Sequence, residues 1–185
     1  HGESQWNLQN RFTGWTDVDL TEKGQKQARR AGRALVDAGI RFDLAFTSVL
    51  KRVIRSQWLI VDEMDLMYIP VISHWRLNER HYGALTGQSR ADVIAQFGEE
   101  QVWQWRRGYA SRPPLMASDD PRAPSNEDRY RHLPSDLLPL GESLEDTVAR
   151  VRVFWEDAIK PALQQDKDVL ICTHGNSQRE GSGER

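Results

Sequence analysis

The chain has 185 residues, of which 38% are hydrophobic and 28% charged, and its formal net charge is −2. This composition predicts one globular domain with a buried core, and the slightly acidic balance argues against nucleic acids and anionic membranes as partners. The single cysteine, Cys172, excludes internal disulfides, and no apolar run approaches the roughly 18 residues needed to cross a bilayer, so we expect a cytoplasmic protein.

The first half of the chain predicts helices and strands in alternation. A helix is expected over residues 21–38, with Thr21 as its cap and apolar residues recurring at three- and four-residue steps. A short buried strand follows at residues 44–47, and a second helix opens at Ser48. Another strand is expected at residues 68–71. A strand followed by a helix is the repeating unit of an α/β sheet.

The second half continues this alternation. Two short helices are predicted at residues 91–97 and 99–107. Residues 113–141 hold six of the eight prolines, which predicts a long surface excursion of the kind that often covers an active site. The clearest helix begins at Ser143, in a capping-box pattern, and leads to a buried strand at residues 168–173. We therefore predict an α/β fold with a mostly parallel sheet flanked by helices on both faces.

The pattern His-Gly-x-Ser occurs twice, at residues 1–4 and 174–177. The second copy directly follows an apolar run, which places His174 at the carboxyl end of a strand, where ligands bind in such sheets. The glycine lets backbone N–H groups approach an anion without a Cβ in the way. Two such turns on neighbouring strands would bring two imidazoles to one phosphoryl-transfer pocket. Short matches also arise by chance, and a histidine at a strand end is often structural, so both interpretations stay open.

Phosphoryl transfer through histidine also needs cations and an acid/base group. Glu79 is the candidate acid/base group, in a segment dense in polar residues, although a surface ion pair would explain it equally well. A guanidinium group suits phosphate because its planar fork bonds two oxygens at once. The candidate cations are Arg52, Arg76, Arg80, Arg106 and Arg107. On composition alone, a solvated helix face is the favoured interpretation of the pair at 106–107.

The remaining histidines and the tryptophans allow other interpretations. His74 and His132 lack a glycine or strand context and are expected to be structural or on the surface, while His81 is ambiguous. No His-x-x-x-His pair or acidic cage predicts a metal site. Residues 103–107 combine tryptophans with arginines, as a platform for stacking single-stranded RNA would, but the acidic balance argues against that partner.

Six longer segments follow one another along the chain. In order they are residues 1–7 (HGESQWN), 11–15 (RFTGW), 47–52 (TSVLKR), 77–85 (LNERHYGAL), 104–108 (QWRRG) and 174–177 (HGNS). They resemble the cofactor-dependent phosphoglycerate mutases of the histidine phosphatase superfamily, from His1 to about Arg179. The resemblance implies interconversion of 3-phosphoglycerate and 2-phosphoglycerate through a phosphohistidine on His1, primed by 2,3-bisphosphoglycerate and without a metal.

The resemblance also implies roles for particular residues. Glu79 would donate and accept the proton of the substrate hydroxyl, and His174 would be the second imidazole. Arg90 stands where the family usually has a lysine, which keeps the charge but changes its reach. The implied substrate- and phosphate-binding residues are Gly2, Glu3, Ser4, Gln5, Trp6, Asn7, Thr13, Gly14, Arg52, Arg80, His81, Tyr82, Arg90, Arg106, Arg107, Gly175 and Asn176. A homodimer or homotetramer is expected.

The family has an apolar strand and an arginine before its first His-Gly, and further elements after the position of Ser177, which this sequence lacks. We therefore expect a catalytic domain at residues 1–177, truncated at both ends, and a flexible or non-native tail at residues 178–185. Alternative functions are a bisphosphoglycerate mutase or a broad phosphatase of the same superfamily, and a non-catalytic binding protein.

Overall fold

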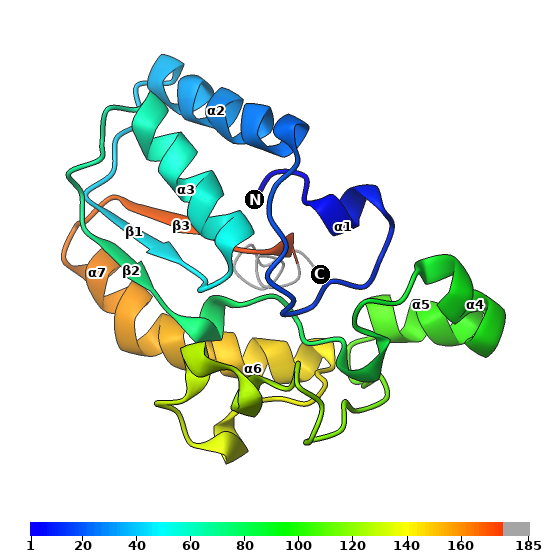
Figure 1. Cartoon of the computed structure of the whole chain (residues 1–185). Helices are drawn as coiled ribbons and strands as arrows, with labels where there is room; N and C mark the ends of the chain where they lie inside the picture. The colour runs from blue at the N-terminus through cyan, green and yellow to red at the C-terminus, as the bar shows by residue number, and fades with distance from the viewer. Residues whose placement is uncertain (176–185) are drawn as a thin grey trace.

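Three parallel strands form the centre of the fold in the computed structural model, which describes residues 1–175 (Figure 1). Strand β1 (Leu44–Thr47) lies between β2 (Val71–Ser73) and β3 (Val169–Cys172). All four residues of β1 are buried, as expected for a central strand covered on both faces. The carboxyl ends of the three strands meet at one edge of the sheet. The predicted Asn176 and the tail lie outside the described residues.

Helices cover both faces of this sheet (Figure 1). On one face lie α2 (Glu22–Asp37) and α3 (Lys51–Glu63), which pack against each other. On the other face, α6 (Leu144–Phe154) runs through a π-helical turn (Trp155–Ile159) into α7 (Lys160–Gln164). The predicted α/β architecture is confirmed. Among residues 1–175, the helices are too short or too polar for any of them to cross a membrane.

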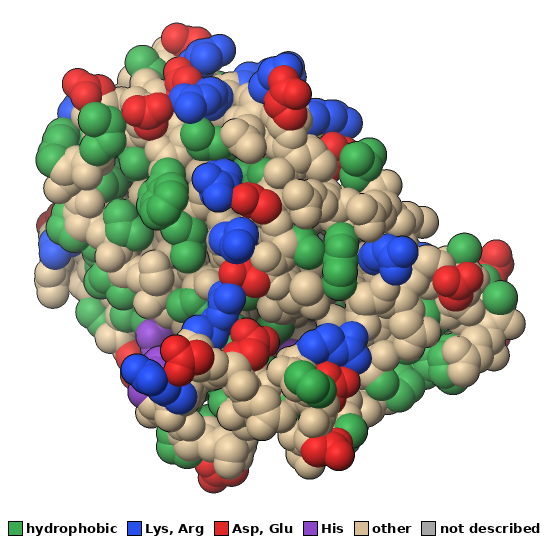
Figure 2. Space-filling view, viewed as in Figure 1, with side chains coloured by type: hydrophobic (Ala, Val, Ile, Leu, Met, Phe, Trp, Pro, Cys, Tyr) green, Lys and Arg blue, Asp and Glu red, His purple; other side chains and the backbone are tan. Residues whose placement is uncertain are grey.

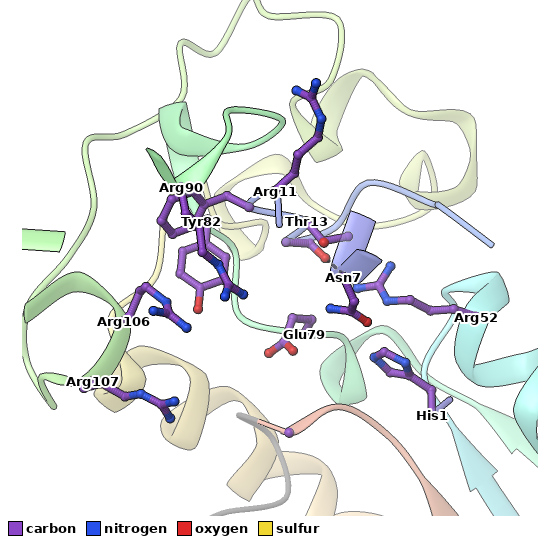
Figure 3. A pocket seen from close by; sticks show the side chains of 13 residues that line it. His1, Asn7, Arg11, Thr13, Arg52, Glu79, Tyr82, Arg90, Arg106 and Arg107 are labelled. Atoms are coloured by element: carbon purple, nitrogen blue, oxygen red, sulfur yellow. Dashed lines mark hydrogen bonds between the residues drawn. The ribbon is translucent and has the colours of Figure 1, made fainter. Parts of the chain in front are cut away.

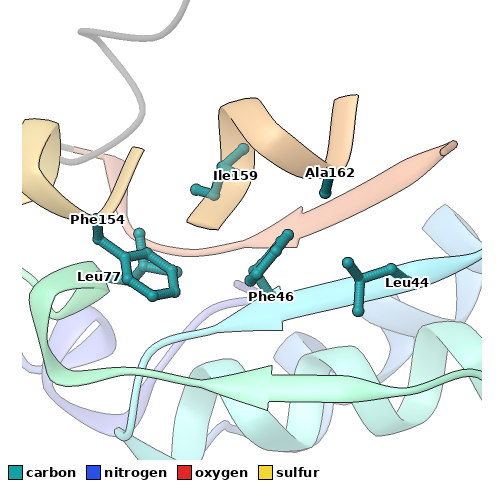
Figure 4. Packing of buried hydrophobic residues seen from close by; sticks show 6 residues of the cluster. All are labelled: Leu44, Phe46, Leu77, Phe154, Ile159 and Ala162. Atoms are coloured by element: carbon teal, nitrogen blue, oxygen red, sulfur yellow. The ribbon is translucent and has the colours of Figure 1, made fainter. Parts of the chain in front are cut away.

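The alternation of side chains along β1 divides the core in two. Phe46 faces α6, where its ring meets Phe154 edge to face at 5.7 Å, beside Ile159 (Figure 4). Ala45 faces the opposite way and packs in a second cluster with Val61. Fully burying a phenylalanine or valine side chain contributes about 1.5–3 kcal/mol, so both helix layers are anchored by this short strand.

Helix starts follow the capping signals in the sequence. The hydroxyl of Thr21 accepts the Gly24 N–H at the start of α2, and Ser143 forms a capping box with Asp146 at the start of α6. The remaining helices are α1 (Gln5–Leu8), α4 (Arg90–Phe97), α5 (Glu99–Arg107) and 3₁₀ turns at Trp75–Leu77, Gly83–Leu85, Pro124–Asn126, Asp128–Tyr130 and Ser135–Leu137. The two short helices α4 and α5 thus confirm the prediction.

Two predicted boundaries were wrong. The strand expected at residues 68–71 lies at β2, because Pro70 has no N–H to donate and the ladder begins after it. The helix expected to open at Ser48 begins at Lys51, whose N–H donates to the Asp17 carboxylate at 2.6 Å. The Ser48 side chain instead turns inward and contacts His174. A loop carboxylate therefore takes the place of the expected serine cap.

Candidate active site

A cavity of about 170 Å³ opens beyond the carboxyl ends of β1 and β3 (Figure 3). Its lining residues are His1, Asn7, Arg11, Phe12, Thr13, Gly14, Arg52, Glu79, Tyr82, Arg90, Arg106, Arg107 and Gly175. All of them except Arg11 and Phe12 were predicted from the sequence. Five arginines and a single carboxylate make this lining strongly cationic. Such a surface attracts a small molecule with several negative charges.

The two predicted imidazoles come together at one end of the cavity. The rings of His1 and His174 stand edge to face with their centroids 5.0 Å apart. The Nδ1 atom of His1 lies 2.6 Å from the carbonyl oxygen of Gly2. Because a carbonyl oxygen can only accept, Nδ1 must carry the proton of a neutral ring, which leaves a lone pair on Nε2. This is the form in which an imidazole acts as a nucleophile.

Close packing of two backbones fixes the turn that carries His1. A Cβ on Gly2 would overlap the backbone of Gly24 in α2, and a Cβ on Gly24 would overlap the backbone of Glu3. The Gly2 N–H donates to the Ser56 hydroxyl at 3.2 Å. The close approach of α2 therefore requires a glycine after His1, whatever else this glycine does in the site.

Other residues of the segment 1–7 hold Asn7 and the start of α2 in position. Ser4 caps α1, and its hydroxyl and N–H both donate to the Asn7 side-chain oxygen, at 2.8 and 3.0 Å. Asn7 therefore presents its NH₂ group to the cavity (Figure 3). Glu3 accepts from the Thr21 hydroxyl at 3.0 Å. Glu3, Ser4, Gln5 and Trp6 do not belong to the cavity lining of the described chain.

Arg52 supplies a buried cation beside His1. Its side chain is 1% exposed and donates to the carbonyl oxygens of Gly14 and Thr16, each at 2.9 Å. Burial lowers the pKa of Arg52 to about 10, so the group stays charged at neutral pH. Gly14 has φ of +51°, a conformation that favours glycine. The loop of residues 13–16 is thus fixed against the start of α3.

Glu79 lies between the two ends of the cavity (Figure 3). Its carbonyl oxygen accepts from Trp15 Nε1 at 2.5 Å and from Arg150 Nη2 at 3.1 Å, and its carboxylate accepts the Arg80 N–H at 2.8 Å. The backbone on either side is therefore restrained. A restrained carboxylate beside an imidazole and an arginine has the arrangement that acid/base catalysis requires.

A buried ion pair behind Glu79 was not predicted. Arg150 Nε donates to Glu142 at 2.6 Å, and the two side chains are only 6% and 4% exposed. Arg150 also donates to the carbonyl of Arg76, and Glu142 accepts the His81 N–H at 2.9 Å. The pair thus fixes the segment that carries Glu79. An arginine within the apolar stripe of α6 was the signal that could have revealed it.

A second cationic region forms the far end of the cavity. Arg106 and Arg107 extend from the last turn of α5, and Arg90 from the start of α4. Burial and then the neighbouring charge of Arg90 lower the pKa of Arg106, an effect that a bound anion would relieve. Arg106 is partly buried and Arg107 is exposed, so the predicted solvated face of α5 is also part of the cavity lining.

Arg80 holds this second cationic region in place through contacts with Tyr82 and Arg106. Its side chain is fully buried, stacks on the Tyr82 ring and donates from Nη2 to the Tyr82 hydroxyl at 3.1 Å and to the Arg106 carbonyl at 2.7 Å. Arg80 is absent from the cavity lining of residues 1–175, and so is His81. No group of three or more potential metal-ligating His, Cys, Asp or Glu residues occurs in that part of the chain.

The proline-rich excursion does not cover the cavity as expected. No residue from 113 to 141 appears in its described lining. The excursion instead packs behind the site, where Tyr130 contacts Trp15, and Arg129 donates to Asp17 at 2.8 Å. Arg129 also donates to the Val49 carbonyl, and Arg122 donates to the Thr86 carbonyl, so the excursion is tied to the rest of the chain beside the loop of residues 13–16.

His81 gives the stability of the fold a defined pH dependence. The ring is buried, its Nδ1 accepts the Gly83 N–H at 2.9 Å, and burial lowers the pKa from 6.5 to about 4. Because the folded-state pKa is depressed, the stabilisation is complete above pH 6.5 and is lost as the pH falls towards 4. Burial also lowers the pKa of His174, with the same sign.

We expect protonation of His81 to lower the free energy of unfolding by about 2 kcal/mol between roughly pH 7.5 and pH 5, and protonation of His174 to lower it further. Urea unfolding at the two pH values measures this change. His81→Gln, which keeps an acceptor for the Gly83 N–H, should lose less stability over the same interval than the wild type. An equal loss in both proteins would contradict the assignment to His81.

Solved structures of other proteins share this fold. A mycobacterial hydrolase matches with a TM-score of 0.72 at 22% identity, over 97% of this chain and 72% of that chain. A mycobacterial glucosyl-3-phosphoglycerate phosphatase matches at 0.70 and 23%, over 97% and 75%. YhfR of Bacillus stearothermophilus matches at 0.66 and 23%, over 97% and 73%.

The amino-acid sequence itself matches one family model over almost its whole length. That model describes the histidine phosphatase superfamily (branch 1), and the match covers residues 1–179. The matched range includes His1, Arg52 and Glu79, which line one cavity, and the buried His174, whose ring contacts that of His1. The chain therefore belongs to the histidine phosphatase superfamily (branch 1), which implies a phosphoryl-transfer enzyme.

Proposed function

We propose that this protein is a 2,3-bisphosphoglycerate-dependent phosphoglycerate mutase, which interconverts 3-phosphoglycerate and 2-phosphoglycerate. The supporting observation is a cavity with cations at both ends: Arg52 beside His1, and Arg106 and Arg107 opposite. A phosphoglycerate carries a phosphate and a carboxylate on one short chain. Two separate cationic regions, with the Glu79 carboxylate between them, match that distribution of charge.

The residues that line the cavity can carry out each step of the mutase reaction. Glu79 removes the proton from the free hydroxyl of 3-phosphoglycerate, and that oxygen attacks the phosphohistidine as the N–P bond to His1 Nε2 breaks. The product is bound 2,3-bisphosphoglycerate. Nε2 of His1 then attacks the other phosphoryl group, and as the N–P bond forms the P–O bond to the glycerate oxygen breaks. Glu79 returns the proton to that oxygen, so 2-phosphoglycerate leaves and the phosphohistidine is restored. Arg52 and the Asn7 amide stabilise the negative charge on the transferring group.

The cavity also suits the priming compound. When bound, 2,3-bisphosphoglycerate supplies the phosphoryl group that first charges His1. It carries three anionic groups, and the lining offers five guanidinium groups to receive them. Phosphoglycerates are accordingly the proposed ligands, with positive charge provided by arginine.

A phosphatase is the second candidate, because one of the proteins of similar fold is a glucosyl-3-phosphoglycerate phosphatase. In a phosphatase, water receives the phosphoryl group, whereas in a mutase a glycerate held in place receives it. Arg106 and Arg107, aimed at the far end of the cavity, favour a retained glycerate. The relative rates of the two reactions therefore decide between these functions.

The test is an assay of 3-phosphoglycerate conversion with and without catalytic 2,3-bisphosphoglycerate, together with detection of an acid-labile phosphate on His1. The proposal expects 2-phosphoglycerate to form faster than inorganic phosphate, and the label to appear. Phosphate release faster than isomerisation would establish the phosphatase instead. Turnover without label would contradict the phosphohistidine mechanism, and neither turnover nor label would indicate a binding protein.

We also propose a homo-oligomer, in the cytoplasm. Strand β2 ends the described sheet, and its residues Val71 and Ile72 are 44% and 42% exposed. Met67 and Tyr68, just before it, are also exposed, and apolar side chains gather over α3 and β2 on the face shown in Figure 2. Exposed apolar surface beside an unpaired strand edge favours pairing with a second copy.

Ile72→Lys is expected to convert the oligomer into a monomer, because a lysine at a sheet edge opposes strand pairing. Light scattering coupled to size-exclusion chromatography measures the mass. Val36→Lys is the matched control, since Val36 is an exposed apolar residue on α2. A monomeric wild type would refute the oligomer, and an Ile72→Lys oligomer would refute this interface.

A further inference from the structure

Ser48 lies just after β1, and its hydroxyl meets the second imidazole of the site. Its Oγ is 3.0 Å from Nε2 of His174, and both side chains are fully buried. The sequence predicted Ser48 only as the start of a helix, but that helix begins three residues later. The proposed mechanism assigns Ser48 no role, although it is the partner of a ring that stands 5.0 Å from His1.

The remaining contact of the Ser48 hydroxyl determines the direction of this hydrogen bond. The N–H of Leu50 donates to Ser48 Oγ at 3.3 Å, so Oγ already acts as an acceptor. If His174 Nε2 also donated to Oγ, the serine hydrogen would be buried without an acceptor among residues 1–175, which costs about 1–3 kcal/mol. If the serine donates to Nε2, the hydroxyl and Nε2 are both satisfied and only the Nδ1–H lacks a partner among these residues, whereas the opposite direction leaves both the serine hydrogen and the Nδ1 lone pair unpaired.

The second assignment places the proton of His174 on Nδ1. That nitrogen is buried and has no hydrogen-bond partner among residues 1–175. Burial, followed by the nearby charge of Arg52, lowers the pKa of His174 well below its usual value, which favours a neutral ring with one N–H. A single N–H of defined position next to His1 can donate to an oxygen of a phosphoryl group.

We propose that Ser48 is a positioning residue that holds His174 as the neutral Nδ1–H tautomer, and that this N–H donates to the phosphoryl group carried by His1. The donor role rests on the proposed phosphohistidine function, whereas the tautomer does not. Serine is suited to this role because its hydroxyl can accept from the backbone and donate to the ring at the same time.

The tautomer is tested by two-bond ¹H–¹⁵N correlation NMR of the full chain at neutral pH, with the His174 signals identified by their absence in His174→Gln. The wild type should show a protonated Nδ1 and an unprotonated Nε2. Ser48→Ala should lose this preference, while Ser73→Ala should keep it. Ser73 is the matched control because its hydroxyl bonds only Thr47, at 2.8 Å, among the described residues. Unchanged His74 and His81 signals would show that the variants are folded.

A wild-type ring protonated on Nε2, or on both nitrogens, would overturn the assignment, and so would an unchanged tautomer in Ser48→Ala.

The donor role is tested by the single-turnover rate of His1 phosphorylation. In Ser48→Ala this rate should fall about 10-fold or more with little change in KM, the scale seen when the outer-shell partner of a metal-binding histidine is removed. Ser48→Thr, which keeps the hydroxyl, should restore it. A wild-type rate in Ser48→Ala would refute the donor role; a wild type that never forms phosphohistidine would refute the proposed function and leave the NMR result standing.

Discussion

Replacing His1 with alanine is expected to abolish phosphoenzyme formation and to reduce turnover by at least about 10⁴-fold, the scale on which enzymes lose activity when their nucleophile is removed. The reason lies in the geometry of the ring. Its Nδ1 donates to the Gly2 carbonyl, and Nε2 is left as the nucleophilic atom. His174 cannot take over, because its Nε2 lone pair is engaged with Ser48 and its Nδ1 carries the ring proton in the tautomer proposed above. Quenched-flow labelling with a radioactive phosphoryl donor measures the effect.

His132→Ala is the matched control for this experiment, since His132 is an exposed histidine in the proline-rich excursion. It should retain wild-type label and turnover. Acid-labile label that survived in His1→Ala would show that another group is the nucleophile, and the assignment of His1 would then be abandoned.

Glu79→Gln is expected to slow isomerisation by about 10²–10⁴-fold, the usual contribution of a general acid or base. Priming of His1 should slow less. The amide of glutamine can still donate a hydrogen bond to a departing oxygen, but it cannot remove a proton from the attacking hydroxyl. Comparing the rate of His1 labelling with the rate of 2-phosphoglycerate formation separates the two steps.

Glu156→Gln provides the control, because Glu156 is half exposed and pairs only with Lys160 at 2.7 Å among the described residues. Both rates should stay at the wild-type level in this variant. If Glu79→Gln slowed priming and isomerisation equally, Glu79 would be acting in binding or as an acid only, and the proposed base role would be wrong.

The sequence predicted those elements whose signals are local. Thr21 and Ser143 act as caps through bonds to residues three positions ahead, so their effect can be read from a short segment. The strand at residues 44–47 begins with three apolar residues, is buried throughout and is central in the sheet. The start of α3 could not be predicted in this way, because Asp17, which binds its first N–H, lies 34 positions earlier.

In the candidate site, too, local signals were predicted from the sequence, whereas features that depend on packing between distant residues were not. Charge alone could not tell whether Arg106 and Arg107 face solvent or a cavity, because that depends on how α5 packs through Trp105 and Val102. The resemblance to a family supplied what composition could not. The Arg150–Glu142 pair was not predicted, because Arg150 restrains the fold by donating hydrogen bonds to carbonyl groups of residues more than 70 positions earlier. Long-range backbone contacts leave little trace in a single sequence.

The contact between Gly2 and Gly24 ties the turn that carries His1 to α2, none of whose residues is in the described lining of the cavity. In a saturation library, position 24 should tolerate glycine alone, since even one methyl group would displace the backbone that carries the nucleophile. Natural sequence variation at this position in the first turn of α2 is subject to the same steric restriction. Anyone grafting this catalytic turn onto another scaffold must therefore transplant the helix along with it.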